Sequence, residues 1–136
     1  MHSGVRVLII DDDPAMVEAV QEILEGAGYA TAAAHDPFCG LRLAREVKPA
    51  AVVCDMVMPN MAGADVFRTL ASDPATAGIA RILISGRSDI DPSCANAFLQ
   101  KPFGASEILR LLEVMTARGF SSVKLKSSLD EPQWHG

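Results

Sequence analysis

The sequence predicts an α/β fold in which helices cover both faces of a five-stranded parallel sheet. Short apolar runs alternate with amphipathic segments five times along the 136 residues, which are enough for one domain. Aspartate-proline pairs stand where several helices should begin. Aromatic residues make up only 5% of the chain, and Ala, Val, Ile and Leu supply most of its hydrophobicity, which suits helices packed on a buried parallel sheet.

The first elements follow from these signals. Residues 5–10 are an apolar, β-branched run and predict a buried strand. Asp13 and Pro14 predict the start of a helix, because aspartate caps free N–H groups and proline fits the first turn. This helix should run to about Glu25, where glycines follow. Residues 29–34 predict a weaker second strand.

The middle of the chain repeats the pattern. Asp36 and Pro37 predict a second helix that ends before Pro49. Residues 50–54 predict a third buried strand, and residues 64–71 predict a helix that Asp73-Pro74 ends.

The last third contains two strands and one full helix. Residues 79–84 and 97–100 predict strands, and residues 106–118 predict an amphipathic helix. Asp91-Pro92, between the strands, offers one or two helical turns at most. Residues 1–119 are therefore expected to form the domain, and residues 120–136, rich in Ser and Lys without a clear period, a flexible C-terminal tail.

Composition narrows the function classes. The net charge is −5 and no basic stripe is visible, so nucleic acid is not an expected partner. No apolar run is long enough to cross a membrane, and the first strand begins too early for a signal peptide. Three widely spaced cysteines match a reduced chain, and we expect a cytoplasmic protein.

Polar residues follow the ends of four predicted strands. Because the carboxyl ends of parallel strands meet at one edge of a sheet, the site should lie there. The residues so placed are Asp11, Asp12, Asp55, Ser85 and Lys101. Two carboxylates ~4 Å apart repel each other by about 4 kcal/mol at an effective dielectric of 20, so the three acids favour a bound cation.

The residue types at this edge predict phosphoryl transfer. Oxygen ligands favour Mg²⁺, Ca²⁺ or Mn²⁺, and Mg²⁺ commonly takes phosphate oxygens as further ligands. A carboxylate such as Asp55 can be phosphorylated as a nucleophile. Lys101 and Ser85 would supply a positive charge and a hydroxyl donor for phosphoryl oxygens.

Four segments stand at the ends of predicted strands: LIIDDDP (8–14), VVCDMVMPNMAG (52–63), ILISG (82–86) and FLQKPF (98–103). In this order they resemble the marker segments of the response-regulator receiver domains of two-component signalling. The resemblance covers about residues 5–118. The resemblance implies a stand-alone, doubly wound, flavodoxin-like (βα)5 fold with strand order 2-1-3-4-5.

The resemblance also implies roles for the acidic residues. Asp55 matches the phosphoacceptor. Asp12 matches the direct Mg²⁺ ligand, Asp11 the acid that acts mainly through water, and the backbone carbonyl of Val57 a third protein ligand. Mg²⁺ is the implied cofactor, and Mn²⁺ would also suit the site.

The remaining matched residues belong to the switch. Ser85 matches the switch hydroxyl, and Lys101 the lysine that pairs with the acceptor and then with the phosphoryl group. The peptide bond before Pro102 is expected to be cis. Phe98 stands at the switch aromatic position, and because phenylalanine lacks a hydroxyl, it must act by packing.

Two features depart from the family pattern. Only fifteen residues separate Ser85 from Lys101, so the fourth helix should be shortened and the output surface atypical. Val57 and Arg87 stand where side chains commonly flank the phosphoryl group, and we hypothesise that they slow its hydrolysis.

The function we expect is a phosphorylation-dependent switch rather than an enzyme. A histidine kinase or phosphotransfer protein would phosphorylate Asp55. The output would be contact with an unknown protein, because no second domain follows, and the switch would be a monomer or weak homodimer. One alternative is a receiver-fold scaffold that is never phosphorylated. The other is an aspartate-nucleophile phosphatase of the haloacid dehalogenase type, which wants an acid at position 57 instead of Val57.

Some polar and sulfur-containing residues are expected to be structural only. Asp13 should cap a helix, and Cys54 should be a core thiol because side chains alternate along a strand. His35 should lie in an exposed loop. The three methionines after Asp55 should fill apolar gaps.

Overall fold

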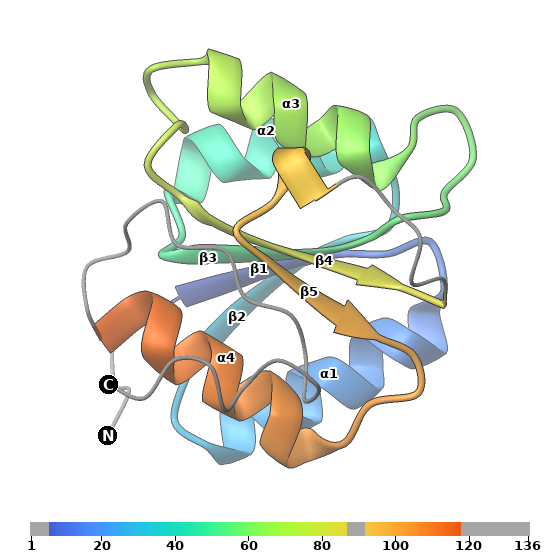
Figure 1. Ribbon diagram of the computed structural model, residues 1–136, viewed down its shortest axis with the longest axis vertical. Helices are drawn as coiled ribbons and strands as arrows, with labels where there is room; N and C mark the ends of the chain where they lie inside the picture. Colours follow the sequence, from blue (N-terminus) through green and yellow to red (C-terminus); the bar gives the residue numbers. More distant parts are fainter. Residues whose placement is uncertain (1–5, 87–91, 118–136) are drawn as a thin grey trace.

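The structure, a computed structural model, describes residues 6–86 and 92–117. Its centre is a parallel sheet of five strands in the order β2-β1-β3-β4-β5 (Figure 1). The strands are β1 (Arg6–Ile10), β2 (Ala30–Ala34), β3 (Ala51–Asp55), β4 (Ala80–Ser85) and β5 (Ala97–Gln100). The predicted fold class and strand order are confirmed.

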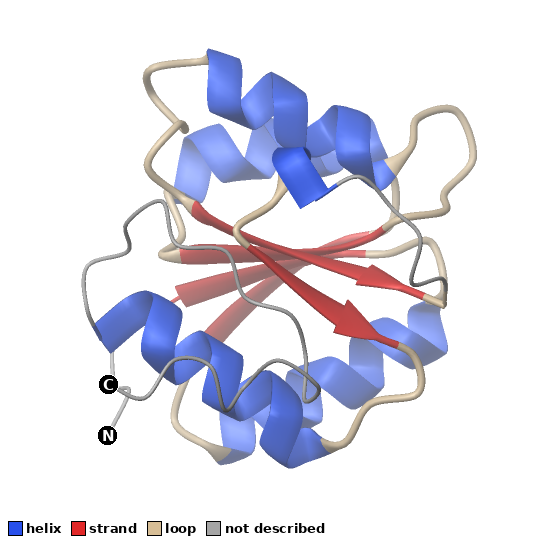
Figure 2. Ribbon diagram, in the orientation of Figure 1, coloured by secondary structure: helices blue, strands red, loops and turns tan. Residues whose placement is uncertain are grey.

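Helices form one layer on each face of the sheet (Figure 2). The helices are α1 (Pro14–Gly26), α2 (Pro37–Val47), α3 (Gly63–Ser72) and α4 (Ala105–Ala117). α1 and α4 cover one face, and α2 and α3 cover the other (Figure 1). Each predicted strand and helix agrees with the structure to within one residue at either end.

Side chains of the strands point alternately into two hydrophobic cores, one on each face of the sheet. Ile9 and Val53 face α1 and α4, whereas Leu8 and Val52 face α2 and α3. Because neighbouring strand residues point to opposite faces, this division fixes the direction of every side chain at the strand ends. Cys54 is fully buried in the core under α2 and α3, as expected for a core thiol.

Two aspartates cap helices as predicted. A side-chain oxygen of Asp13 accepts a hydrogen bond from the Ala15 N–H at 3.0 Å, and one of Asp36 accepts from the Cys39 N–H at 2.8 Å. A proline follows each cap at the start of the helix. These bonds satisfy N–H groups that have no partner within the helix.

The connection between β4 and β5 is short. Its described part contains one 3-10 turn, η1 (Pro92–Cys94), which agrees with the predicted shortening. Asn96 ties the connection to β4, because its side-chain oxygen accepts from the Arg81 N–H at 2.8 Å and its N–H donates to the Arg81 carbonyl at 2.9 Å. Residues 87–91, which include Arg87, lie outside the described residues, and the atypical output surface stays a prediction.

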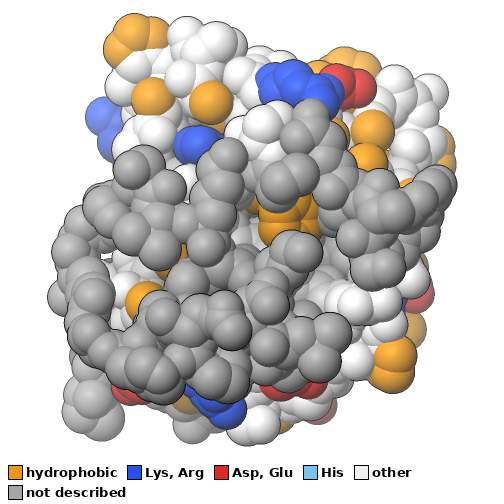
Figure 3. Space-filling model, viewed as in Figure 1, with side chains coloured by type: hydrophobic (Ala, Val, Ile, Leu, Met, Phe, Trp, Pro, Cys, Tyr) orange, Lys and Arg blue, Asp and Glu red, His pale blue; other side chains and the backbone are white. Residues whose placement is uncertain are grey.

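The described surface carries few large apolar side chains. Phe38 and Val57 are the large hydrophobic residues that the described ranges expose. In the view of Figure 3, the described hydrophobic atoms occur in small groups among polar ones. Among residues 6–86 and 92–117, no helix is both long and apolar enough for a membrane span. The predicted tail, residues 120–136, lies outside the described residues.

Candidate functional site

The register of the sheet brings the predicted site residues to one edge. Ile10 pairs with Cys54, and Asp55 pairs with Ile84, so β1, β3 and β4 end at nearly the same level. Two further backbone bonds extend the ladder past the strand ends. The Asp11 N–H donates to the Ala34 carbonyl at 3.1 Å, and the Met56 N–H donates to the Ile84 carbonyl at 2.8 Å.

Three carboxylates meet at this edge. Asp11, Asp12 and Asp55 each place one carboxylate oxygen within 4.8 Å of the others. Asp11 is only 3% exposed and Asp55 only 7%, whereas Asp12 is open to solvent. Two acids of the cluster, Asp11 and Asp55, are therefore buried, and the third, Asp12, faces solvent.

Asp11 is held by the turn that follows it. Its Oδ1 accepts a hydrogen bond from the Asp13 N–H at 2.9 Å. Burial raises the pKa of Asp11; this bond opposes the rise, and the charge of Asp55 adds to it. Burial thus makes the negative form of Asp11 costly, and a bound cation would offset that cost.

Each oxygen of Asp55 has its own partner. Lys101 Nζ lies 2.9 Å from Asp55 Oδ1, and the Val57 N–H donates to Oδ2 at 3.2 Å. Burial alone would lower the pKa of Lys101, but the hydrogen bond and charge of Asp55 raise it overall. Lys101 therefore keeps its positive charge at neutral pH.

β4 and the end of β5 place the lysine. The Lys101 N–H donates to the Ser85 carbonyl at 2.8 Å, and the Lys101–Pro102 peptide bond is cis, as expected. Ser85 ends β4, one residue beyond the partner of Asp55, and is 4% exposed. All five predicted site residues thus lie at the same edge of the sheet.

The donor set fits a divalent cation such as Mg²⁺. Three carboxylate oxygens are hard ligands, and Lys101 supplies a single positive charge against them. The exposed Asp12 leaves one side open for water or phosphate oxygens. The predicted role of the Val57 carbonyl stays a prediction.

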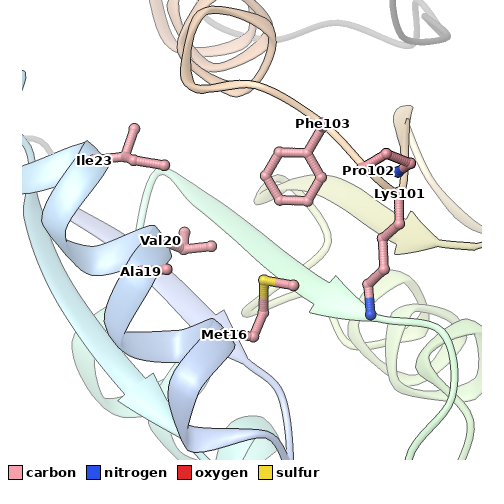
Figure 4. A pocket seen from close by; sticks show the side chains of 7 residues that line it. All are labelled: Met16, Ala19, Val20, Ile23, Lys101, Pro102 and Phe103. Atoms are coloured by element: carbon pink, nitrogen blue, oxygen red, sulfur yellow. The ribbon is translucent and has the colours of Figure 1, made fainter.

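An apolar groove that the sequence did not reveal adjoins the site. It has a volume of about 560 Å³ and lies between α1 and the loop that joins β5 to α4. Figure 4 shows Met16, Val20 and Ile23 of α1 on one side, Phe103 on the other and Lys101 at one end. Its two sides are about 80 residues apart in sequence. The apolar stripe along α1 was the signal that could have suggested it.

The residues expected to be structural lie where they were predicted. Met58 is buried, and the other two methionines of the loop pack against the core under α2 and α3. His35 is exposed. Phe98 is half-buried against the same core and pairs across the sheet with Leu83. Its switch role stays a prediction.

Comparisons with known proteins agree with this geometry. The model of the response regulator receiver domain family matches residues 7–113. The DNA-binding response regulator MtrA of Mycolicibacterium smegmatis is 30% identical over 133 residues, which cover 93% of this chain and 53% of that protein. The DNA-binding regulator RpaA of Synechocystis is 34% identical over 119 residues, with 83% and 49% covered. The chain thus spans about half the length of these curated relatives.

Solved structures share the same fold. A putative response regulator from Chloroflexus aurantiacus has a TM-score of 0.78 at 27% identity, covering 84% of this chain and 98% of the other. The receiver domain of the sensor histidine kinase PA1611 from Pseudomonas aeruginosa, with a magnesium ion in its active-site cleft, has a TM-score of 0.78. It is 21% identical, covers 85% of this chain and 99% of its own, and so supports the fold alone. Because the family model spans most of the sequence and the sheet order agrees, the chain belongs to the response regulator receiver domain family.

Proposed function

We propose that this protein is a signalling switch that accepts a phosphoryl group on Asp55 from a phosphohistidine. The donor would be a histidine kinase or a phosphotransfer protein. The observation that carries the proposal is the environment of Asp55. It is a buried carboxylate that has Lys101 at 2.9 Å and two more acids within 4.8 Å. Three acids this close repel one another unless a cation joins them, so the arrangement suits a carboxylate that takes part in cation-assisted phosphoryl transfer.

The transfer itself needs little from the protein beyond position and charge. An Asp55 carboxylate oxygen attacks phosphorus, the P–N bond breaks, and its electron pair stays on the imidazole nitrogen of the donor. A Mg²⁺ ion held by Asp11, Asp12, Asp55 and the Val57 carbonyl would neutralise charge on the phosphoryl oxygens. Lys101 holds Asp55 before the reaction and pairs with the phosphoryl group after it.

The signal would pass from the phosphoryl group to the surface through Ser85 and Phe98. The Ser85 hydroxyl donates to a phosphoryl oxygen, and the movement of its loop changes how the half-buried Phe98 packs. Output through contact with another protein is part of the proposal. MtrA and RpaA are named as DNA-binding regulators, and this chain spans about half of their length.

The groove beside Lys101 bears on how a donor approaches. Lys101 borders both the groove and Asp55, so a protein that brings its phosphohistidine to Asp55 also covers part of the groove. The phosphatase alternative has less support, because the residue two positions after Asp55 is Val57, an exposed side chain without an acid.

The test is intact-mass spectrometry after incubation with acetyl phosphate and Mg²⁺. We expect one added phosphoryl group on the native protein and on Asp36→Asn, a control in which asparagine still caps α2. The adduct should be absent from Asp55→Asn and from native protein in excess EDTA. No adduct on the native protein under any condition would favour the unphosphorylated scaffold.

A further inference from the structure

Gly63 packs directly against the main chain of the proposed phosphoacceptor. It is the first residue of α3, it is buried, and its N–H donates to the Met56 carbonyl at 2.9 Å. A Cβ on Gly63 would overlap the Asp55 carbonyl oxygen and lie only 3.0 Å from the Asp55 carbonyl carbon. These two atoms are main chain and cannot rotate away; the third near atom, Leu83 Cδ1 at 3.0 Å, belongs to a side chain. α3 and Asp55 can be this close because residue 63 has no side chain.

Asp55 has little freedom on its other side. It is the last residue of β3 and pairs with Ile84, and the N–H of the next residue donates to the Ile84 carbonyl at 2.8 Å. A side chain at position 63 must therefore push Asp55 against β4 or push the start of α3 outward. Because α3 follows the loop that carries Val57, either movement disturbs a group that holds the Asp55 carboxylate.

A second glycine in the same layer gives a matched comparison. A Cβ on Gly40 of α2 would also be crowded, at 2.5 Å from Ile10 Cδ1 and 2.9 Å from Cγ1. The obstruction there is a side chain, which can repack at a cost in stability. A methyl group at position 40 would therefore crowd a core side chain, whereas one at position 63 would crowd the main chain of Asp55.

We propose that Gly63 is a positioning residue, whose missing side chain sets where the Asp55 carboxylate stands relative to Lys101 and the other two acids. This inference rests on the proposed function of Asp55. An ordinary structural role predicts that substitution lowers stability alone. The positioning role predicts that it also weakens metal binding and slows phosphorylation in protein that is still folded.

The experiment compares the full native chain with Gly63→Ala and Gly40→Ala. Circular dichroism gives the folded fraction, and all rates are taken well below each melting temperature. Phosphorylation by acetyl phosphate is followed by intact mass over a range of Mg²⁺ concentrations. The rise of melting temperature with Mg²⁺ gives metal binding without any reaction.

We expect Gly63→Ala to be phosphorylated at least ~10-fold more slowly per folded molecule, because misplacement by about 1 Å can cost a factor of 10². Its half-saturating Mg²⁺ concentration should rise and its Mg²⁺-induced melting shift should shrink. Gly40→Ala should melt at a lower temperature yet keep its rate and Mg²⁺ response within about twofold. A folded Gly63→Ala with native rate and native Mg²⁺ response would overturn the proposal.

Two further measurements deal with an unfolded Gly63→Ala variant and with a native protein that gives no adduct. If Gly63→Ala is unfolded in plain buffer, the assay is repeated in sucrose, which favours the compact state, and expressed per folded molecule. If the native protein gives no adduct, the proposed function fails. The Mg²⁺-induced melting shifts of the two variants then still decide whether Gly63 positions the acidic cluster.

Discussion

Two ion pairs in this protein have the same length and different surroundings. Lys101 Nζ lies 2.9 Å from Asp55 Oδ1, and Arg45 Nε lies 2.9 Å from Asp73 Oδ2. The exposed side-chain fractions are 35% and 9% for the first pair, against 61% and 25% for the second. The first pair has two further acids beside it, whereas the second joins α2 to the end of α3.

The comparison shows that distance alone does not reveal what an ion pair does. Charges near water are screened and gain little from pairing, so Arg45 and Asp73 at most help to fasten two helices. Charges removed from water interact strongly, and changing one of them alters the energy of the others. Asp55 is buried and stands beside two further acids, so the first pair should respond more strongly to a new phosphoryl group than the second.

The largest expected effect comes from removing Lys101, the half-buried cation beside Asp55. Lys101→Met keeps the length of the side chain but leaves no fixed positive charge at the phosphoryl group. We expect phosphorylation by acetyl phosphate to slow by about 10²-fold, the usual effect of losing one stabilising donor. Intact mass against time gives the rate. Arg42→Met, which removes an exposed cation from α2, should match the native rate. A Lys101→Met rate within twofold of native would remove the functional distinction between the two ion pairs.

The next effect concerns a buried hydrogen bond that stabilises the end of α3. Thr76 is 1% exposed, and its hydroxyl donates to the Leu70 carbonyl at 2.7 Å, three residues before Asp73. Thr76→Val keeps the shape but removes this buried bond, so the Leu70 carbonyl retains only the longer bond from the Asp73 N–H at 3.4 Å. We expect the free energy of unfolding to fall by about 1–2 kcal/mol, measured in urea. Thr69→Val, whose exposed hydroxyl bonds within α3, should cost less than ~0.5 kcal/mol. Equal losses in the two variants would contradict this ranking.

Local signals predicted most of the fold. Asp13 and Asp36 each come just before a proline, and each does cap a helix, because capping depends on neighbours two or three residues away. The site could be placed because Asp11 and Asp55 end apolar runs and a parallel sheet gathers such ends. In both cases a short pattern decides the outcome.

What the sequence did not predict depends on packing between distant segments. Asp73 could be identified as a helix end, but its partner Arg45 lies 28 residues earlier and on another helix. Gly63 could be identified as a loop boundary, but its contact with the Asp55 carbonyl depends on how closely α3 approaches β3. The groove needs α1 and Phe103 together. No periodicity in a single sequence reports such distances.

The smallest expected effect is the pH dependence of the stability that the Arg45–Asp73 pair contributes. Bonds from the Ala75 N–H and from Arg45 lower the pKa of Asp73 below its usual 3.8 in the folded protein. A lowered folded-state pKa means that the contribution of Asp73 to stability is fully present above the unfolded pKa and is lost as pH falls through the folded one. Arg45→Gln should lower the melting temperature by about 1–3 °C at pH 7. The difference from native should shrink below pH ~3.8 as Asp73 becomes protonated. In an Asp73→Asn background, where Arg45 has no carboxylate to pair with, Arg45→Gln should leave the melting temperature at pH 7 unchanged. A difference that persists at low pH would mean that Arg45 stabilises α2 by packing and not by its charge.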